Sequence, residues 1–282
     1  MTRIAIVTDS TCDLSPEVRA QFGITMVPLN VHFGEESLRD QIDLTSDEFM
    51  ERLQRSRELP KTSQPSVGLF EETFRSVAED HDAIIAVLIS SKLSGTVQSA
   101  TVAAESLINE TPVEIVDSRN VSLGLGFQVI RAAELVAGGL NLTEVASEIR
   151  ADTARYHLAF LVDTLEYLQR GGRIGRAASL VGTVLHLKPI LGIEEGQVVP
   201  YERTRTKWKA IEGLAQFARG FPQISRLGVL YSTDAGEVDQ LEARLLGVQA
   251  THGRVRAQFS PVIGTHVGPG ALGICVYTGE GP

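Results

Sequence analysis

Short apolar runs of strand length alternate with longer helical patterns along this chain, and this alternation constrains the fold more than any other feature. Four such runs lie in the first half, at Ile4 to Thr8, Thr25 to His32, Ala83 to Ile89 and Val113 to Asp117. Strands that are joined through helices pair in parallel. The first half therefore predicts a mostly parallel sheet flanked by helices.

Capping residues mark several of the expected helix starts. Ser15-Pro16 places a proline at a first helical position, and Thr45-Ser46-Asp47-Glu48 has the spacing of a capping box. Two further helices are expected at Leu123 to Val136 and Thr143 to Ile149.

A second α/β unit is expected to begin near the strand-like run His157 to Val162. Beyond it, extended runs at Lys188 to Glu194 and Gln197 to Glu202 flank Glu195-Gly196, a pair that favours a two-residue hairpin turn. Helices are expected at Lys207 to Arg219 and Glu237 to Leu246, and strands at Leu227 to Tyr231, Val255 to Phe259 and Leu272 to Tyr277. We therefore expect two α/β domains, residues 1–155 and 156–282, the second with a mixed sheet.

Two hydroxyl-rich segments, residues 61–66 (KTSQPS) and 90–96 (SSKLSGT), each precede a helical pattern. Helix N-termini favour anions because their backbone N–H groups are unpaired and carry partial positive charge. Ser94 also follows an apolar run at the carboxyl end of an expected strand, where ligands of open α/β sheets bind. Hydroxyls of Thr62 and Ser94 would complete a cradle for a carboxylate or phosphate. The alternative is that Thr62, Ser66 and Ser94 are ordinary N-caps.

The chain is acidic, with a formal charge of −9, which argues against general binding to nucleic acid or to anionic membranes. The segment from Arg170 to Lys209 differs, because it carries eight basic and three acidic residues. Such a segment attracts a phosphate-bearing ligand or an acidic partner, or consists of solvated helix faces. Glycines around Arg170, Arg173 and Arg176 predict a loop that aims guanidinium groups at one spot.

Further sequence features indicate where in the cell the protein resides and what role its cysteines have. No signal peptide core and no apolar run of bilayer-spanning length is present, so a cytoplasmic location is expected. Cys12 and Cys275 are too few for a disulfide framework and lack metal-site spacing, so both are expected to be reduced, structural residues.

The glycines of residues 268–273 (GPGALG) match the dinucleotide fingerprint in spacing, but a strand-like run and no helix follows, so they predict a tight loop carrying His266. A phosphate-binding loop G-x-x-x-x-G-K-[ST] and a nucleophile elbow G-x-S-x-G are missing. An enzymatic alternative remains, in which Ser94 is a nucleophile, His266 its base and Asp9 or Asp117 the orienting acid.

Eight segments in one order resemble the DegV family, which includes the fatty-acid-binding subunit of bacterial fatty acid kinase. These are DSTCDL at 9–14, KTSQPS at 61–66, SSKLSGTVQSA at 90–100, DS at 117–118, LQRGGRIG at 168–175, LKPIL at 187–191, RTRTKWKA at 203–210 and HVGPGALG at 266–273.

This resemblance implies a two-domain α/β protein that holds one long-chain fatty acid in its interdomain region, with no further cofactor. Thr62, Ser63, Ser94, the Gly95 backbone and His266 would surround the carboxylate. Arg170, Arg173 and Arg203 would present this head group to a separate ATP-dependent kinase, which forms the acyl phosphate. The implied protein is thus a carrier, and the alternative is a hydrolase or acyltransferase that depends on Ser94 and His266.

Overall fold

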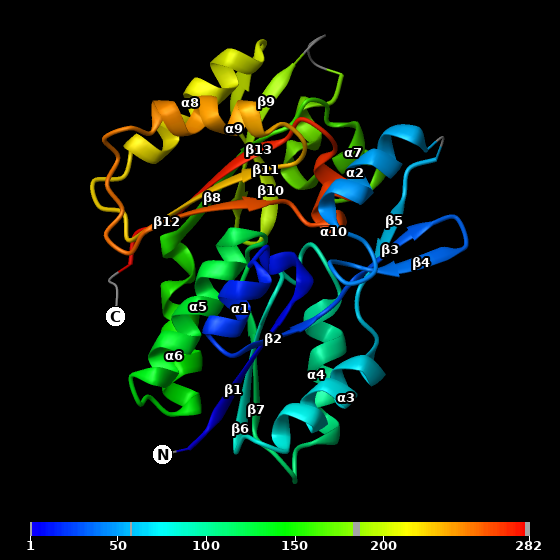
Figure 1. The fold of residues 1–282 in the computed structure, drawn as a ribbon, viewed down its shortest axis with the longest axis vertical. Coiled ribbons are helices and arrows are strands. Elements are labelled where there is room, and N and C mark those ends of the chain that lie inside the picture. Colours follow the sequence, from blue (N-terminus) through cyan, green and yellow to red (C-terminus); the bar gives the residue numbers. More distant parts are fainter. Residues whose placement is uncertain (1, 57, 183–186, 280–282) are drawn as a thin grey trace.

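The computed structural model describes residues 2–56, 58–182 and 187–279. Its first sheet is four-stranded and parallel, in the order β2-β1-β6-β7 (Figure 1). The strands are β1 (Ile4–Asp9), β2 (Ile24–Val27), β6 (Ala83–Leu88) and β7 (Val113–Asp117). β1 and β6 are buried along their whole length, which explains their continuous apolar sequences.

Helices cover both faces of this sheet. α3 (Val67–Ala78) and α4 (Thr96–Ser106) pack on one face through a core that includes Phe70 and Phe74. α1 (Pro16–Gln21), α5 (Leu123–Ala137) and α6 (Leu142–Asp152) share a core with the other face. The predicted caps are present, because the Ser15 hydroxyl accepts from the Val18 N–H and Pro16 is the first residue of α1.

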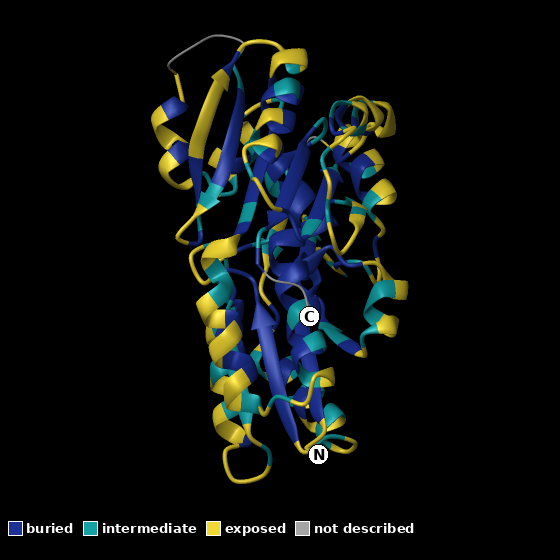
Figure 2. Ribbon diagram, turned by 90° about the vertical axis from the view of Figure 1, so that its left-hand side faces the viewer, coloured by how far each residue is buried: buried dark blue, intermediate teal, exposed yellow. Residues whose placement is uncertain are grey.

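The second large sheet is mixed and six-stranded, in the order β10-β9-β8-β13-β11-β12. Only β11 and β12 pair in parallel. The strands are β8 (Tyr156–Leu161), β9 (Lys188–Glu194), β10 (Gln197–Thr204), β11 (Arg226–Tyr231), β12 (Arg254–Gln258) and β13 (Leu272–Tyr277). α8 (Lys207–Arg219) and α9 (Ala235–Arg244) cover one face. The other face packs on α5, which is therefore buried between the two sheets (Figures 1 and 2).

A third, three-stranded antiparallel sheet corrects one prediction. The run from Thr25 to His32 is not a single strand, because it divides at Pro28 into β2 and β3 (Asn30–Phe33). β3 leaves the parallel sheet and pairs with β4 (Glu36–Arg39) and β5 (Lys61–Ser63). Proline lacks the N–H that a continuing strand would donate, so the chain changes sheets there.

Short helices pack beside this small sheet. α2 (Ser46–Arg55) begins at the predicted capping box, in which Thr45 and Glu48 exchange hydrogen bonds. α7 (Glu166–Arg170) and α10 (Pro261–Val267) lie close to α2 in Figure 1, and α10 contacts both helices. Three 3₁₀ turns complete the elements: η1 (Ser10–Cys12), η2 (Thr153–Arg155) and η3 (Gly175–Leu180).

The structure confirms the predicted fold class, with one parallel sheet and one mixed sheet, each flanked by helices. The Glu195-Gly196 hairpin is also confirmed, since both residues have positive φ and Glu194 pairs with Gln197. None of the helices in the described ranges combines the length and apolarity that crossing a membrane requires.

Phe74 tests the packing of α3. Its side chain is fully buried and its ring centroid lies 5.6 Å from that of Phe70. Phe74→Ala is expected to lower the free energy of unfolding by about 3–5 kcal/mol in urea denaturation, because it removes buried ring surface and leaves a cavity. Ile108→Ala is the control, since Ile108 is 76% exposed, and should change stability by about 0.5 kcal/mol or less. Equal effects would contradict this packing.

Candidate ligand-binding site

A cavity lies between the carboxyl edge of the parallel sheet and the face of the mixed sheet that packs on α5. Thr11, Leu29 and Ile89 line it from the segments that follow β1, β2 and β6, while Leu158 and Val198 line it from β8 and β10. The parallel sheet has its switch point here, because the chain leaves β1 toward β2 and leaves β6 toward β7 on the opposite side. The empty space within it, open mouth and adjoining solvent included, is about 760 Å³.

The walls of the cavity are mostly apolar, and polar side chains make up the rest of the lining. The apolar residues are Leu29, Ile89, Leu93, Val121, Leu158, Phe160, Leu168, Ile193, Val198, Phe259, Val262, Ile263 and Val267. The polar ones are Thr11, Thr62, Ser63, Gln64, Ser94, Ser122, Arg173 and His266. A second cavity, here called the vestibule, shares Thr62, Arg173 and His266 with the first. These three residues therefore stand between the apolar interior and the vestibule.

Thr62 and His266 meet across the mouth, although they are far apart in sequence. Thr62 Oγ1 lies 3.0 Å from His266 Nε2. His266 Nδ1 is buried and has no hydrogen-bond partner among the described residues. Burial, together with the nearby charge of Arg173, lowers the pKa of His266 to about 4. His266 is therefore neutral at pH 7, and its imidazole can donate or accept a hydrogen bond.

Ser94 and Gly95 lie directly before α4, as predicted for the second hydroxyl-rich segment. Gly95 is the N-cap residue, and the Ser94 hydroxyl lies 3.3 Å from the Thr96 N–H and 2.8 Å from the Thr96 hydroxyl. The Gly95 N–H has no acceptor among the described residues. This N-terminus therefore offers backbone and hydroxyl donors to an anion beside Ser94.

The first hydroxyl-rich segment does precede a helix, as predicted, but Thr62 is not at the helix start. It lies on β5, and α3 begins only at Val67 with Ser66 as its capping residue. Alternation along β5 separates neighbouring hydroxyls, because Thr62 faces His266 while the Ser63 hydroxyl lies 2.9 Å from His32 Nε2. Ser63 still lines the cavity.

The predicted convergence of arginines is wrong in detail. Arg173 lines both cavities, and its guanidinium donates to the Leu93 and Gly171 carbonyls at 3.0 and 2.8 Å. Arg170 lines only the vestibule and pairs with Glu166. Arg176 instead pairs with Glu194, and Arg203 is exposed on β10 outside both cavities. Arg170 and Arg173 thus both lie at the vestibule, whereas Arg176 on η3 and Arg203 on β10 lie elsewhere.

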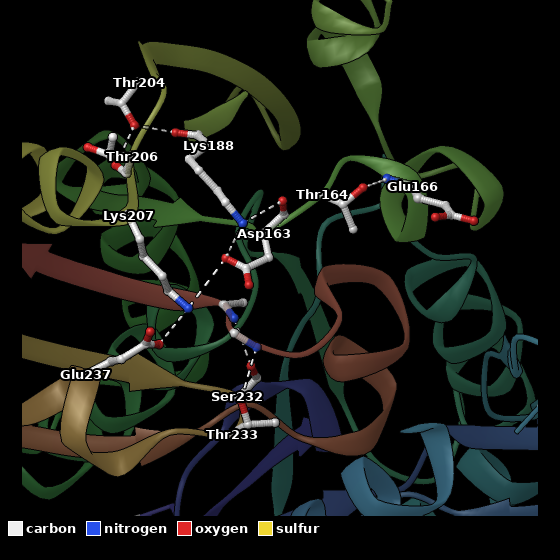
Figure 3. A network of polar contacts seen from close by, with 12 residues as sticks. Asp163, Thr164, Glu166, Lys188, Thr204, Thr206, Lys207, Ser232, Thr233 and Glu237 are labelled. Carbon is white, nitrogen blue, oxygen red and sulfur yellow. Dashed lines mark hydrogen bonds and ion pairs between the residues drawn. The ribbon is translucent and has the colours of Figure 1, made fainter. Parts of the chain in front are cut away.

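Part of the basic segment is neutralised within the protein. Figure 3 shows Lys188 and Lys207 pointing toward Asp163, at 3.0 and 3.4 Å, and Lys207 also pairs with Glu237 at 2.7 Å. Beside them, the Thr233 hydroxyl accepts from the Gly270 N–H. Gly270 has a φ of +73°, and a Cβ there would lie 2.6 Å from Asp163 Oδ2. This network therefore supports the tight loop that follows His266.

Three buried carboxyl groups stand behind the cavity wall, and each bonds a residue that lines it. Asp9 accepts from the Thr11 hydroxyl and N–H, and Asp13 accepts from the Ser122 hydroxyl. Asp40 accepts from the Val262 N–H. Burial raises the pKa of all three, to about 8 for Asp13 and about 7 for Asp40.

The arrangement does not form the hydrogen bonds of the catalytic triad that the enzymatic alternative requires. Within the described ranges no hydrogen bond joins Ser94 to His266, because each is bonded to a threonine instead. Asp9 is bonded to Thr11 and Ile89, and Asp117 is bonded to Ser91 and Arg119, so neither orients the imidazole. The geometry therefore supplies no activated nucleophile at Ser94.

Burial also disfavours nucleophilic chemistry at the two cysteines. Cys12 and Cys275 are both buried and unpaired, and burial raises the pKa of the Cys12 thiol to about 12. A thiol with such a pKa is a poor nucleophile at neutral pH. In the described part of the chain, no three acidic, histidine or cysteine side chains gather as metal ligands would.

Sequence reasoning missed α10, which carries Val262, Ile263, His266 and Val267 into the cavity. His266 lies on this helix, rather than in the loop that follows it. Ser260-Pro261 was an available signal, since it repeats the serine–proline start seen at α1. Asp40 was missed as well, because Val262, whose N–H donates to it, is 222 residues away in sequence.

Comparisons with known proteins identify the family to which this chain is similar. The family model of the DegV family, described as uncharacterised proteins, matches residues 3–279. Protein DegV of Bacillus subtilis is 36% identical, and the match covers 96% of this chain and 98% of that protein. A DegV domain-containing protein of Deinococcus radiodurans is 37% identical over 97% of this chain and 98% of that protein.

Solved structures show the same likeness. A fatty-acid-binding DegV family protein from Thermus thermophilus superposes with a TM-score of 0.90, at 38% identity, over 98% of this chain and 99% of that one. DegV from Bacillus subtilis, a fatty acid binding protein, has a TM-score of 0.88 at 36% identity over 99% of this chain and 100% of that one. This chain belongs to the DegV family.

The low pKa of His266 predicts a pH-dependent contribution to stability. The unfolded chain takes up a proton as the pH falls below about 6.5, whereas folded His266 does so only near 4. Protonation of the unfolded state therefore lowers the free energy of unfolding across this window. His266→Gln lacks this component, so wild type should lose more stability than the variant in urea denaturation between about pH 7 and about pH 4.5. A stability difference that does not vary with pH would contradict the assignment.

Proposed function

We propose that this protein binds one long-chain fatty acid, with the acyl tail in the apolar cavity and the carboxylate at its mouth. The observation that supports this most directly is one cavity whose lining is mostly apolar and also includes Thr62, Ser94 and His266. Names of relatives add support, because the Thermus thermophilus and Bacillus subtilis structures are described as fatty acid binding. In this proposal the two α/β domains divide at residues 155 and 156, and the ligand lies between them.

The tail would provide most of the affinity. Burial of each methylene contributes about 0.8 kcal/mol, so an acyl chain of ordinary length gains enough apolar contact for tight binding. Such a ligand would leave slowly, because release exposes this surface to water.

The head group needs polar partners, since an unpaired carboxylate in an apolar cavity is strongly disfavoured. We assign this role to the Thr62 and Ser94 hydroxyls, the Gly95 N–H and the His266 imidazole. Ser63 would shape the mouth, because its hydroxyl already contacts His32. Arg173 adds positive charge beside His266.

We further propose that the bound carboxyl group is presented to a separate ATP-dependent kinase, which transfers a phosphoryl group to it. The vestibule supports this idea, because it reaches Thr62 and His266 from outside and is lined by Lys61, Arg170 and Arg173. Positive charge around an entrance attracts an acidic partner surface or nucleotide phosphates. Arg203 would contact the kinase away from the vestibule.

Lipid binding is tested by replacing residues that carry hydroxyl groups in and beside the proposed head-group site. Protein purified from a bacterial host should carry a stoichiometric fatty acid in native mass spectrometry, and stripped protein should bind it in calorimetry. Thr62→Ala and Ser94→Ala should weaken binding about tenfold, because each removes a hydrogen bond to a charged group. Ser63→Ala is the matched control and should remain within about twofold of wild type. A protein that neither carries nor binds fatty acid, or that hydrolyses acyl esters through Ser94, would refute the proposal.

Presentation to a kinase is tested at Arg203, which touches neither cavity. Arg203→Glu should leave lipid affinity unchanged and slow acyl phosphate formation about tenfold when a cognate kinase and ATP are added. Arg3→Glu is the control and should have no effect, because Arg3 directly precedes β1, whose N-terminal end lies at the bottom of Figure 1, away from β10. Equal rates for the two variants would remove Arg203 from the kinase contact.

A further inference from the structure

α10 begins without a capping bond from its own N-terminal residue. Ser260 is the N-cap residue, yet its side chain makes no capping hydrogen bond, and Pro261 has no N–H to donate. A helix start buried in this way needs acceptors from elsewhere, because each unpaired N–H costs free energy.

Two aspartates from the N-terminal part of the chain supply those acceptors. Asp13 Oδ1 accepts from the Ser260 N–H at 3.0 Å, and Asp40 Oδ1 accepts from the Val262 N–H at 3.2 Å. Both carboxylates are buried, at 5% and 0% exposure, so water does not compete for these bonds. The partners are 247 and 222 residues apart in sequence, which makes this cap a tertiary contact.

The second oxygen of each carboxylate is also bonded. Asp13 Oδ2 accepts from the Ser122 hydroxyl at 2.5 Å, and Asp40 Oδ2 accepts from the Ser10 hydroxyl at 2.6 Å. Each aspartate therefore links the first turn of α10 to another segment. Asp13 links it to Ser122, the residue before α5, and Asp40 links it to Ser10 on η1. Ser122 is itself held in a strained backbone conformation, with a φ of +57°.

α10 delivers His266 to the cavity mouth five residues after its first turn begins at Pro261–Val262. A helix of seven residues is too short to hold its place by its own hydrogen bonds. The position of the imidazole against Thr62 thus depends on how firmly the first turn is held.

We propose that Asp13 and Asp40 are positioning residues for ligand binding, which fix the first turn of α10 and thereby place His266 opposite Thr62. This inference rests on the proposed fatty acid site for its effect on affinity. The placement of His266 itself can be measured on the unliganded protein.

The test compares variants that differ in the bond to α10. Asp40→Leu removes the acceptor of the Val262 N–H and fills the space of the carboxylate. Thr8→Val is the matched control, because it removes a buried hydrogen bond, from the Thr8 hydroxyl to the Val87 carbonyl at 2.8 Å, and leaves the bonds of Asp40 and α10 in place. Asp40→Asn is the rescue variant, since its amide oxygen can still accept from the Val262 N–H.

Three readouts separate positioning from a general loss of stability. In Asp40→Leu, the NMR titration of His266 should shift from its low pKa of about 4 toward 6.5, because the ring is no longer held in its buried place. Amide exchange at Val262 and Gly264 should become faster, and palmitate affinity should fall about tenfold. Thr8→Val should leave the titration and the affinity near wild type, and Asp40→Asn should restore most of the exchange protection.

Two results would overturn the inference: an unchanged His266 titration in Asp40→Leu, or an equal shift in Thr8→Val. Should Asp40→Leu fail to fold, Asp13→Gly replaces it, because glycine removes the acceptor of the Ser260 N–H and tolerates the φ of +50° at this position. An unchanged His266 titration in Asp13→Gly again counts against the inference. If wild type binds no palmitate, the proposed function fails, while titration and exchange still decide the placement of α10.

Discussion

The burial of three carboxyl groups beside one another is the constraint on which the rest of this structure depends. Asp9, Asp13 and Asp40 stay buried only because donors from distant segments satisfy their oxygens. Those donors come from the segment that follows β6, from the residue before α5 and from the first turn of α10. Satisfying the carboxylates therefore fixes the relative positions of the segments that form the cavity.

The cavity follows from this arrangement and from the topology of the parallel sheet. β1 and β6 are neighbours whose connections leave in opposite directions, so their carboxyl ends bound an opening that neither connection covers. The mixed sheet lies over this opening, tied to it by the Ser90 hydroxyl, which donates to the Gly196 carbonyl at 2.6 Å. Apolar residues of β8, β9 and β10 then complete the walls.

Much of the fold could be predicted from the sequence, because local signals and tertiary packing agree. β7, β9 and β13 have the expected bounds, and the Glu195-Gly196 turn has the positive φ values that its residues allow. The wrong predictions concern segments whose secondary structure depends on tertiary contacts. At Pro28 the apolar pattern continues but the strand does not, and α10 is too short to show helical periodicity.

The sequence by itself determined the alternation of elements, the fold class, the hydroxyl-rich segments and, through its ordered motifs, the family. The meeting of Thr62 with His266, the separation of Thr62 from Ser63 and the outward direction of Arg203 were decided only by the tertiary structure. The physical reason is that these relations depend on strand register and on hydrogen bonds between segments more than 200 residues apart, such as the 204 between Thr62 and His266. Local residue preferences carry no information about either.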